Sequence, residues 1–131
     1  MNDKELGALG EKVAAEYLKR KGYEILEKNF TVGFSQFNKG EIDIIARKSK
    51  TIVFAEVKTM EIEANGKPVV LSPEQRVDFR KQKQLIKLAQ IWLVKNKIPF
   101  DSLWQIDVIS VKISCQNRKA KVSHFENAFG S

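Results

Sequence analysis

The sequence predicts an α/β fold in which two helices and five strands follow one another in the order αβββαββ. Three observations predict it: a capped helix at the start, short β-like runs with tight connections, and a strand–helix–strand succession. That succession favours a parallel crossover, whereas a three-residue connection between two strands implies an antiparallel hairpin. We therefore expect a mixed sheet with helices packed on it.

The first helix is predicted over residues 3–21. Asn2 and Glu5 have the spacing of a capping box, and Gly22 is a fitting residue just beyond the helix end. Apolar residues recur on one face at helical spacing, which predicts the buried side of the helix. This face carries Leu6, Leu9, Val13 and Tyr17.

A strip of small residues lies along this helix and consists of Gly7, Gly10 and Ala14. Because each glycine costs about 1 kcal/mol relative to alanine inside a helix, their presence predicts a close approach to another backbone. Glu11 projects at the edge of the strip and not from the solvent side. An inward-leaning role for this carboxylate is therefore expected, although an ordinary surface acid is the alternative.

Three β-like runs follow, over residues 23–30, 41–47 and 51–59. The last two are separated by only three residues, which predicts a hairpin. We expect a loop between the first two runs. This loop carries two aromatic residues that are candidates for base stacking or for a contact between two copies of the chain, Phe34 and Phe37.

A second helix is predicted over residues 72–96. Ser72 is a good N-cap, Pro73 suits the first helical position, and Gln75 completes a capping box. Two further strands are predicted after it, over residues 103–113 and 120–125.

Composition restricts the class of protein but does not identify a function. The chain has 131 residues, of which 43% are hydrophobic and 30% charged, which is typical of a single globular domain, expected here over residues 1–131. Lys and Arg number 23 against 16 Asp and Glu, and the net charge of +7 favours a polyanionic partner. Cys115 is the only cysteine, which excludes an internal disulfide and a cysteine-based zinc site. With no apolar leader or bilayer-spanning run, we expect a cytoplasmic protein.

Charged residues interrupt the two strands of the predicted hairpin. Because side chains alternate along a strand, Glu41 and Asp43 share one face, as do Glu56 and Lys58. The hairpin can bring Asp43 beside Glu56, and a divalent cation such as Mg²⁺ relieves the repulsion of such a pair. Lys58 would then orient or deprotonate a water. A buried ion pair between Glu56 and Lys58, or a solvent-facing charged surface, remains the alternative.

These residues resemble the D…(D/E)xK core of the restriction-endonuclease-like nucleases. Longer segments are similar to the uncharacterised bacterial YraN-like family, and they extend the likeness over nearly the whole chain. They are GEKVA (10–14), GEIDIIA (40–46), FAEVKT (54–59) and HFENAF (124–129). The chain departs from the family at Met60, where an arginine is usual.

The YraN-like family is in turn similar in its core to archaeal Holliday junction resolvases. The resemblance implies a restriction-endonuclease-like αβββαβ core and a metal-dependent nuclease. Glu11, Asp43 and Glu56 would be the metal-associated acids, and Lys58 the catalytic base or water-orienting group. By analogy with the resolvases, the resemblance also implies branched DNA as substrate and a homodimer.

The second helix carries a basic stripe made of Arg76, Arg80, Lys83 and Lys87, with no acid at helical pairing distance. A solvated helix face is the usual reading of such a stripe, but here phosphate binding is a fair alternative. Lys81 lies on the opposite, inward side, where we expect it to hold the scissile phosphate.

The remaining polar and aromatic candidates are interpreted structurally. Glu41 is either a supporting acid or alternative ligand, or a strand-end residue near solvent, and the latter is preferred. His124 is the only histidine and is read as structural, Trp92 and Trp104 as core, and Cys115 as inert.

The sequence thus predicts Mg²⁺- or Mn²⁺-dependent phosphodiester hydrolysis, with nucleic acid, expected to be DNA, as the partner. A catalytically silent nucleic-acid-binding or protein-docking module on the same fold is the alternative. A membrane-surface protein is disfavoured because the first helix is not strongly basic and amphipathic.

Overall fold

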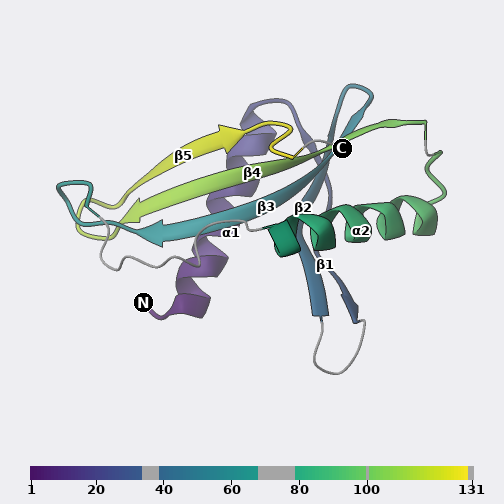
Figure 1. The fold of residues 1–131 in the computed structure, drawn as a ribbon. Helices are drawn as coiled ribbons and strands as arrows, with labels where there is room; N and C mark the ends of the chain where they lie inside the picture. Colours follow the sequence, from purple (N-terminus) through teal and green to yellow (C-terminus); the bar gives the residue numbers. More distant parts are fainter. Residues whose placement is uncertain (34–38, 68–78, 100, 130–131) are drawn as a thin grey trace.

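The computed structural model of the chain describes residues 1–33, 39–67, 79–99 and 101–129. The predicted order αβββαββ is confirmed (Figure 1). The elements are α1 (Asp3–Arg20), β1 (Glu24–Gly33), β2 (Lys39–Lys48), β3 (Thr51–Glu61), α2 (Phe79–Lys95), β4 (Leu103–Ser114) and β5 (Lys119–Phe125).

The strands form one sheet in the order β1-β2-β3-β4-β5. Neighbouring strands are antiparallel except β3 and β4, which are parallel and flank α2 in the chain. The prediction of a mixed sheet with a parallel crossover is therefore confirmed.

The two helices cover opposite faces of this sheet (Figure 1). Alternation along β3 divides its side chains, so that Val53 and Ala55 join the core under α1, whereas Ile52 and Phe54 join the core under α2. Trp92 of α2 packs edge-on against Phe54. Neither of these helices is long and apolar enough to cross a membrane, as far as the structure describes the chain.

Helix α1 begins and ends as its sequence predicts. The Asn2 side chain accepts a hydrogen bond from the Glu5 backbone N–H at 2.8 Å, and the Glu5 side chain reciprocates at 3.5 Å. Gly22 has φ +93°, a left-handed conformation that suits the residue after a helix.

The strip of small residues on α1 makes a close approach at one glycine only. A Cβ built on Gly10 would overlap the Thr59 side chain, so α1 touches β3 there through a side chain and not, as predicted, through the strand backbone. A Cβ on Gly7 would meet nothing within 4 Å, so the predicted close approach is wrong for Gly7. The Gly10 contact fixes the position of the next residue, Glu11, against the sheet.

Strand β2 leaves β3 before either strand ends. Pairing of the two runs only from Lys48↔Thr51 to Ile44↔Ala55, whereas β1 and β2 stay paired as far as Gly33↔Lys39. The β1–β2 hairpin therefore departs from the rest of the sheet, as Figure 1 shows. We call the point of separation the fork.

Some predicted boundaries differ from the structure. Strand pairing continues beyond the expected ends, so β1 extends to Gly33 and β2 begins at Lys39, inside the segment expected to be a loop. Strand β3 reaches Glu61 because it pairs with β4 to its end. The predicted start of the second helix and six residues singled out above lie outside the described residues; they are Phe34, Phe37, Ser72, Pro73, Gln75 and Arg76.

Candidate functional site

Three carboxylates from two elements meet at the fork. Glu11 comes from α1, and Glu41 and Asp43 come from β2. One carboxylate oxygen of each lies within 4.8 Å of those of the other two, and all three residues are partly buried. The sequence placed Glu41 near solvent, but the structure places it inside this group. We call Glu11, Glu41 and Asp43 the acid cluster.

Asn29 of β1 connects two members of the acid cluster. Its Nδ2 lies 3.3 and 3.1 Å from the two carboxylate oxygens of Glu11 and 2.8 Å from Oε1 of Glu41. The residue has φ +54°, a left-handed conformation in the middle of a strand that asparagine tolerates better than most residues. Sequence reasoning missed it, because no motif marks a single asparagine within a β-like run.

Asp43 substitutes for part of the strand ladder that is lost at the fork. Its Oδ2 accepts a hydrogen bond from the Val57 backbone N–H at 2.7 Å. Burial and the neighbouring Glu56 carboxylate raise the pKa of Asp43 to about 8, with smaller contributions from Glu11 and Glu41 and an opposing one from the Val57 hydrogen bond. Asp43 is therefore an acid that needs a positive charge nearby in order to ionise at neutral pH.

Glu56 lies beside Asp43, as the hairpin pairing predicts. Ile45 pairs with Phe54, and two residues further along each strand in the diverging direction come Asp43 and Glu56. The negative charge of Glu56 raises the pKa of Asp43, as expected of two carboxylates that lie close together.

The Glu56 side chain is 7% exposed, and two lysines approach one of its carboxylate oxygens. Lys58 Nζ lies 3.4 Å and Lys81 Nζ 3.9 Å from Oε1, while Oε2 is buried and has no hydrogen-bond partner among the described residues. Burial raises the pKa of Glu56, and the charges of Lys81 and Lys58 oppose the rise. The orphaned oxygen is the unusual feature, because buried carboxylate oxygens are normally bonded.

These residues fit a hard divalent cation. The acid cluster and Glu56 offer carboxylate oxygens, which are the ligand type that Mg²⁺ and Mn²⁺ prefer. One of these oxygens, Oε2 of Glu56, is buried and has no partner among the described residues. A cation would also offset the repulsion that keeps the pKa of Asp43 high. Glu11, Asp43 and Glu56 would hold it, as the resemblance implies, with Glu41 as a further oxygen donor.

The predicted basic stripe is exposed on α2 where the structure describes it. Arg80, Lys83 and Lys87 all lie on the solvent side of the helix, whereas Lys81 turns inward to Glu56. Lys83 Nζ lies 4.6 Å from the ring centroid of Phe79, an aromatic residue that is 69% exposed.

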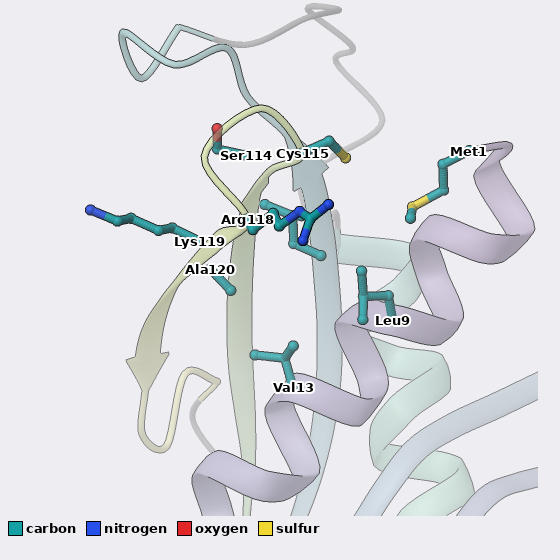
Figure 2. A pocket seen from close by; sticks show the side chains of 9 residues that line it. Met1, Leu9, Val13, Ser114, Cys115, Arg118, Lys119 and Ala120 are labelled. Carbon is teal, nitrogen blue, oxygen red and sulfur yellow. The ribbon is translucent and has the colours of Figure 1, made fainter.

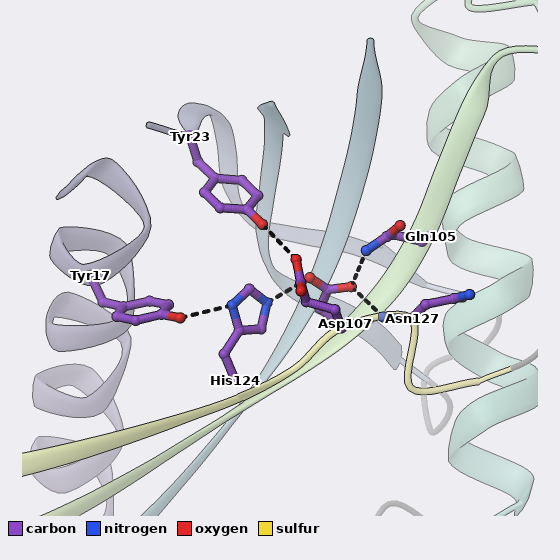
Figure 3. Close-up of polar contacts among 7 residues, drawn as sticks. Tyr17, Tyr23, Gln105, Asp107, His124 and Asn127 are labelled. Atoms are coloured by element: carbon purple, nitrogen blue, oxygen red, sulfur yellow. Dashed lines mark hydrogen bonds and ion pairs between the residues drawn. The ribbon is translucent and has the colours of Figure 1, made fainter. Parts of the chain in front are cut away.

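A second polar cluster joins α1, β4 and β5 and contains His124 (Figure 3). Tyr17 Oη lies 3.0 Å from His124 Nδ1, and His124 Nε2 lies 2.6 Å from Oδ2 of the fully buried Asp107. Asp107 also accepts hydrogen bonds from the Gln105 side chain and the Asn127 backbone N–H, both at 2.9 Å. Both ring nitrogens and both Asp107 oxygens are engaged, which accords with a structural role for His124.

A hollow of about 360 Å³ lies on the α1 side, between that helix and the β4–β5 connection (Figure 2). Leu9, Val13 and Ala120 form apolar walls, and Arg118 and Cys115 lie at its rim. A hydrogen bond to Glu61 and burial raise the pKa of the Cys115 thiol, which makes it a poor nucleophile. The hollow contains none of the acid cluster.

Comparison of the sequence with known proteins assigns the chain to a family. A model described as "Uncharacterised protein family UPF0102" matches residues 10–111, a range that includes Glu11, Asp43, Glu56 and Lys58. The chain is 39% identical over 127 residues to the UPF0102 protein of Alkaliphilus oremlandii (strain OhILAs), covering 97% of this chain and 99% of the relative. It is also 39% identical to the UPF0102 protein of Clostridium botulinum (strain 657 / Type Ba4), covering 97% and 95%.

Proposed function

We propose that this chain, which belongs to the UPF0102 family, is a divalent-metal-dependent nuclease that hydrolyses phosphodiester bonds of DNA. The observation that carries the proposal is the buried Oε2 of Glu56, which has no partner among the described residues. Glu56 lies beside Asp43 at the fork, and two lysines approach its other carboxylate oxygen. A purely structural ion pair leaves no reason for an orphaned oxygen next to further acids.

Bound Mg²⁺ or Mn²⁺ would neutralise phosphate charge and make a water ligand acidic enough to act as a nucleophile near neutral pH. Glu11, Asp43 and Glu56 would hold the ion. Hydrolysis then adds the water oxygen to phosphorus and breaks the bond to the departing sugar oxygen, which takes up a proton.

Lys58 and Lys81 supply the positive charge of the site. Both side chains are about one-third exposed while their ammonium groups lie against Glu56, so each can reach a bound phosphate without leaving the fork. We assign Lys58 to orienting the attacking water and Lys81 to a phosphate oxygen, whose charge grows as the bond breaks. The two lysines come from β3 and α2, so the site requires both elements.

The exposed basic residues of α2 would contact flanking DNA. Arg80, Lys83 and Lys87 lie on the same helix as Lys81 and face solvent, so a duplex held at the fork can extend along them. The likeness to junction resolvases supports branched DNA as the preferred substrate and a dimer as the active form.

The test is cleavage of matched linear, single-stranded, flapped and four-way-junction DNA in Mg²⁺ or Mn²⁺. The wild-type protein should cut at least one of them, and Glu56→Ala and Lys58→Ala should each slow cleavage at least about 100-fold. Glu63→Ala and Lys50→Ala remove the same charges from exposed positions and should leave cleavage unchanged. Sedimentation velocity on the same samples measures whether a dimer forms.

Binding without metal-dependent cleavage of any substrate would overturn the nuclease and favour a silent nucleic-acid-binding module. Failure to bind any of the four substrates would overturn DNA as the partner as well.

A further inference from the structure

The acid cluster contains a group that is neither acidic nor a metal-binding motif residue. Asn29 places one amide nitrogen against three carboxylate oxygens of Glu11 and Glu41. Ionised carboxylates only accept hydrogen bonds, so the NH₂ side of the amide, and not its oxygen, must face them. The partial positive charge of those two hydrogens lies between two negative groups.

We propose that the Asn29 amide is a stand-in for the divalent cation and that it sets the cation affinity of the acid cluster. This inference rests on the proposed function, because it concerns the same metal site. In the cation-free protein the amide holds Glu11 and Glu41 together. With a cation bound, the Asn29 side chain would give up its hydrogen bonds to the two carboxylates and, after rotation about χ2, would offer its oxygen instead.

The position of Asn29 suits this role. The residue is exposed, whereas the members of the acid cluster are partly buried, so a cation arriving from solvent meets the amide first. In the β1–β2 register Lys28 pairs with Ile44 and Phe30 with Ile42, which leaves Asn29 opposite Asp43. An amide oxygen is itself a ligand for hard cations, so the rotated side chain remains useful after binding.

The backbone of Asn29 restricts which variants test the inference. Its φ of +54° favours Asn, Asp and Gly, so Asn29→Asp and Asn29→Gly change the side chain without straining the strand. Asn29→Gly removes the amide, whereas Asn29→Asp keeps its shape and adds a carboxylate. Asn65→Asp is the matched control, because Asn65 lies in an exposed turn and an aspartate keeps its bond to the Lys67 backbone N–H.

The experiment measures Mn²⁺ affinity by isothermal titration calorimetry and the melting temperature with and without Mn²⁺. We expect Asn29→Asp to bind Mn²⁺ about tenfold more tightly than the wild type, because a further carboxylate would face the ion. Without Mn²⁺, both Asn29 variants should have a lower melting temperature than the wild type. Adding Mn²⁺ should raise the melting temperature of both variants by more than it raises that of the wild type. Asn65→Asp should match the wild type in both quantities.

Two outcomes are distinct. If the wild-type protein binds no Mn²⁺, the metal site of the proposed function fails. If it binds Mn²⁺ and loses it in Glu56→Ala, but the Asn29 variants show unchanged affinity and an unchanged gain in melting temperature, only the stand-in role of Asn29 is overturned. If the Asn29 variants melt below the wild type by the same amount with and without Mn²⁺, the role of Asn29 is structural and the stand-in role is likewise overturned.

Discussion

Burying the carboxylates of Asp43 and Glu56 in a sheet costs free energy of folding. Each is surrounded by apolar strand residues, and burial is the largest influence on the pKa of both. Such a pair weakens the folded state unless a positive charge compensates it. Lys58 and Lys81 approach Oε1 of Glu56, whereas its Oε2 has no partner among the described residues. The proposed cation would complete this compensation.

The raised pKa of Asp43 predicts how stability depends on pH in the cation-free protein. Its ordinary value is 3.8 and its folded value about 8, so between these values the folded protein keeps a proton that the unfolded chain has lost. The free energy of unfolding therefore falls as pH rises between these two values. Urea unfolding in a chelator should show a steeper fall in the free energy of unfolding from about pH 5 to about pH 8 for the wild type than for Asp43→Asn.

Asp101→Asn is the control for that comparison, because Asp101 is exposed and should not alter the pH dependence. Equal slopes for the wild type and Asp43→Asn would show that Asp43 ionises normally in the folded protein.

At the scale of elements, one glycine of α1 allows the helix to pack closely against β3. The contact between Gly10 and Thr59 brings the helix close to β3 and thereby places Glu11 at the fork. Gly7 lies one turn earlier on the same helix and touches nothing that a methyl group would disturb. The two glycines are therefore alike in sequence but different in function.

Substitution by alanine should have opposite effects at the two positions. Gly10→Ala should lower the free energy of unfolding by about 1–3 kcal/mol, because the added methyl group overlaps Thr59. Gly7→Ala should raise it by about 0.5–1 kcal/mol through helix propensity alone. Chemical denaturation of both variants checks this, and a stabilised Gly10→Ala would contradict the close approach.

Helix α2 carries two kinds of basic residue, and they predict different effects on DNA binding. Replacing the outward Arg80 and Lys83 by glutamine should reduce the salt dependence of binding by about 0.9 for each phosphate that is no longer neutralised, or about 2 in total. Lys50→Gln, in the exposed β2–β3 turn, should leave the salt slope as it is. Fluorescence anisotropy at several salt concentrations, without cleaving metal, measures the slope. An unchanged slope in the double variant would remove α2 from the DNA interface.

At the scale of the whole molecule, the fork holds the acid cluster, whereas the polar cluster around His124 and Asp107, which we call the Asp107 cluster, connects the elements. The fork ends the β2–β3 pairing early, and there Glu11 of α1 meets Glu41 and Asp43 of β2, while Glu56 of β3 acts on the pKa of Asp43. The Asp107 cluster ties α1, β4 and the end of β5 together through Tyr17 and His124, and Tyr23 adds a hydrogen bond to Glu126 at 3.2 Å. Burial and Glu126 raise the pKa of Tyr23 to about 12, so its hydroxyl remains a donor at neutral pH.

Asp107→Ala should therefore destabilise the protein by about 3 kcal/mol, because it leaves the His124 ring and the Asn127 backbone N–H without their buried acceptor. Mn²⁺ affinity at the acid cluster should be retained wherever the variant is still folded. Asp101→Ala removes an exposed aspartate and serves as the control. A stable Asp107→Ala protein, or a folded one without Mn²⁺ binding, would contradict this division of roles.

Local patterns in the sequence were sufficient for most elements. The capping box of Asn2 and Glu5 and the short β2–β3 connection are features of neighbouring residues, so they predicted α1 and the hairpin. Strand ends were less predictable because they depend on how far the partner strand continues, as at Gly33 and Glu61.

The acid cluster itself was decided by tertiary structure. Sequence alone placed Asp43, Glu56 and Lys58 at matching strand positions, and the family resemblance added Glu11. That Glu41 joins them, that Asn29 bridges two acids, and that Lys81 reaches Glu56 all depend on where β2 leaves β3 and how α1 and α2 pack on opposite faces. Such contacts join residues far apart in the chain, and no local period or propensity encodes them.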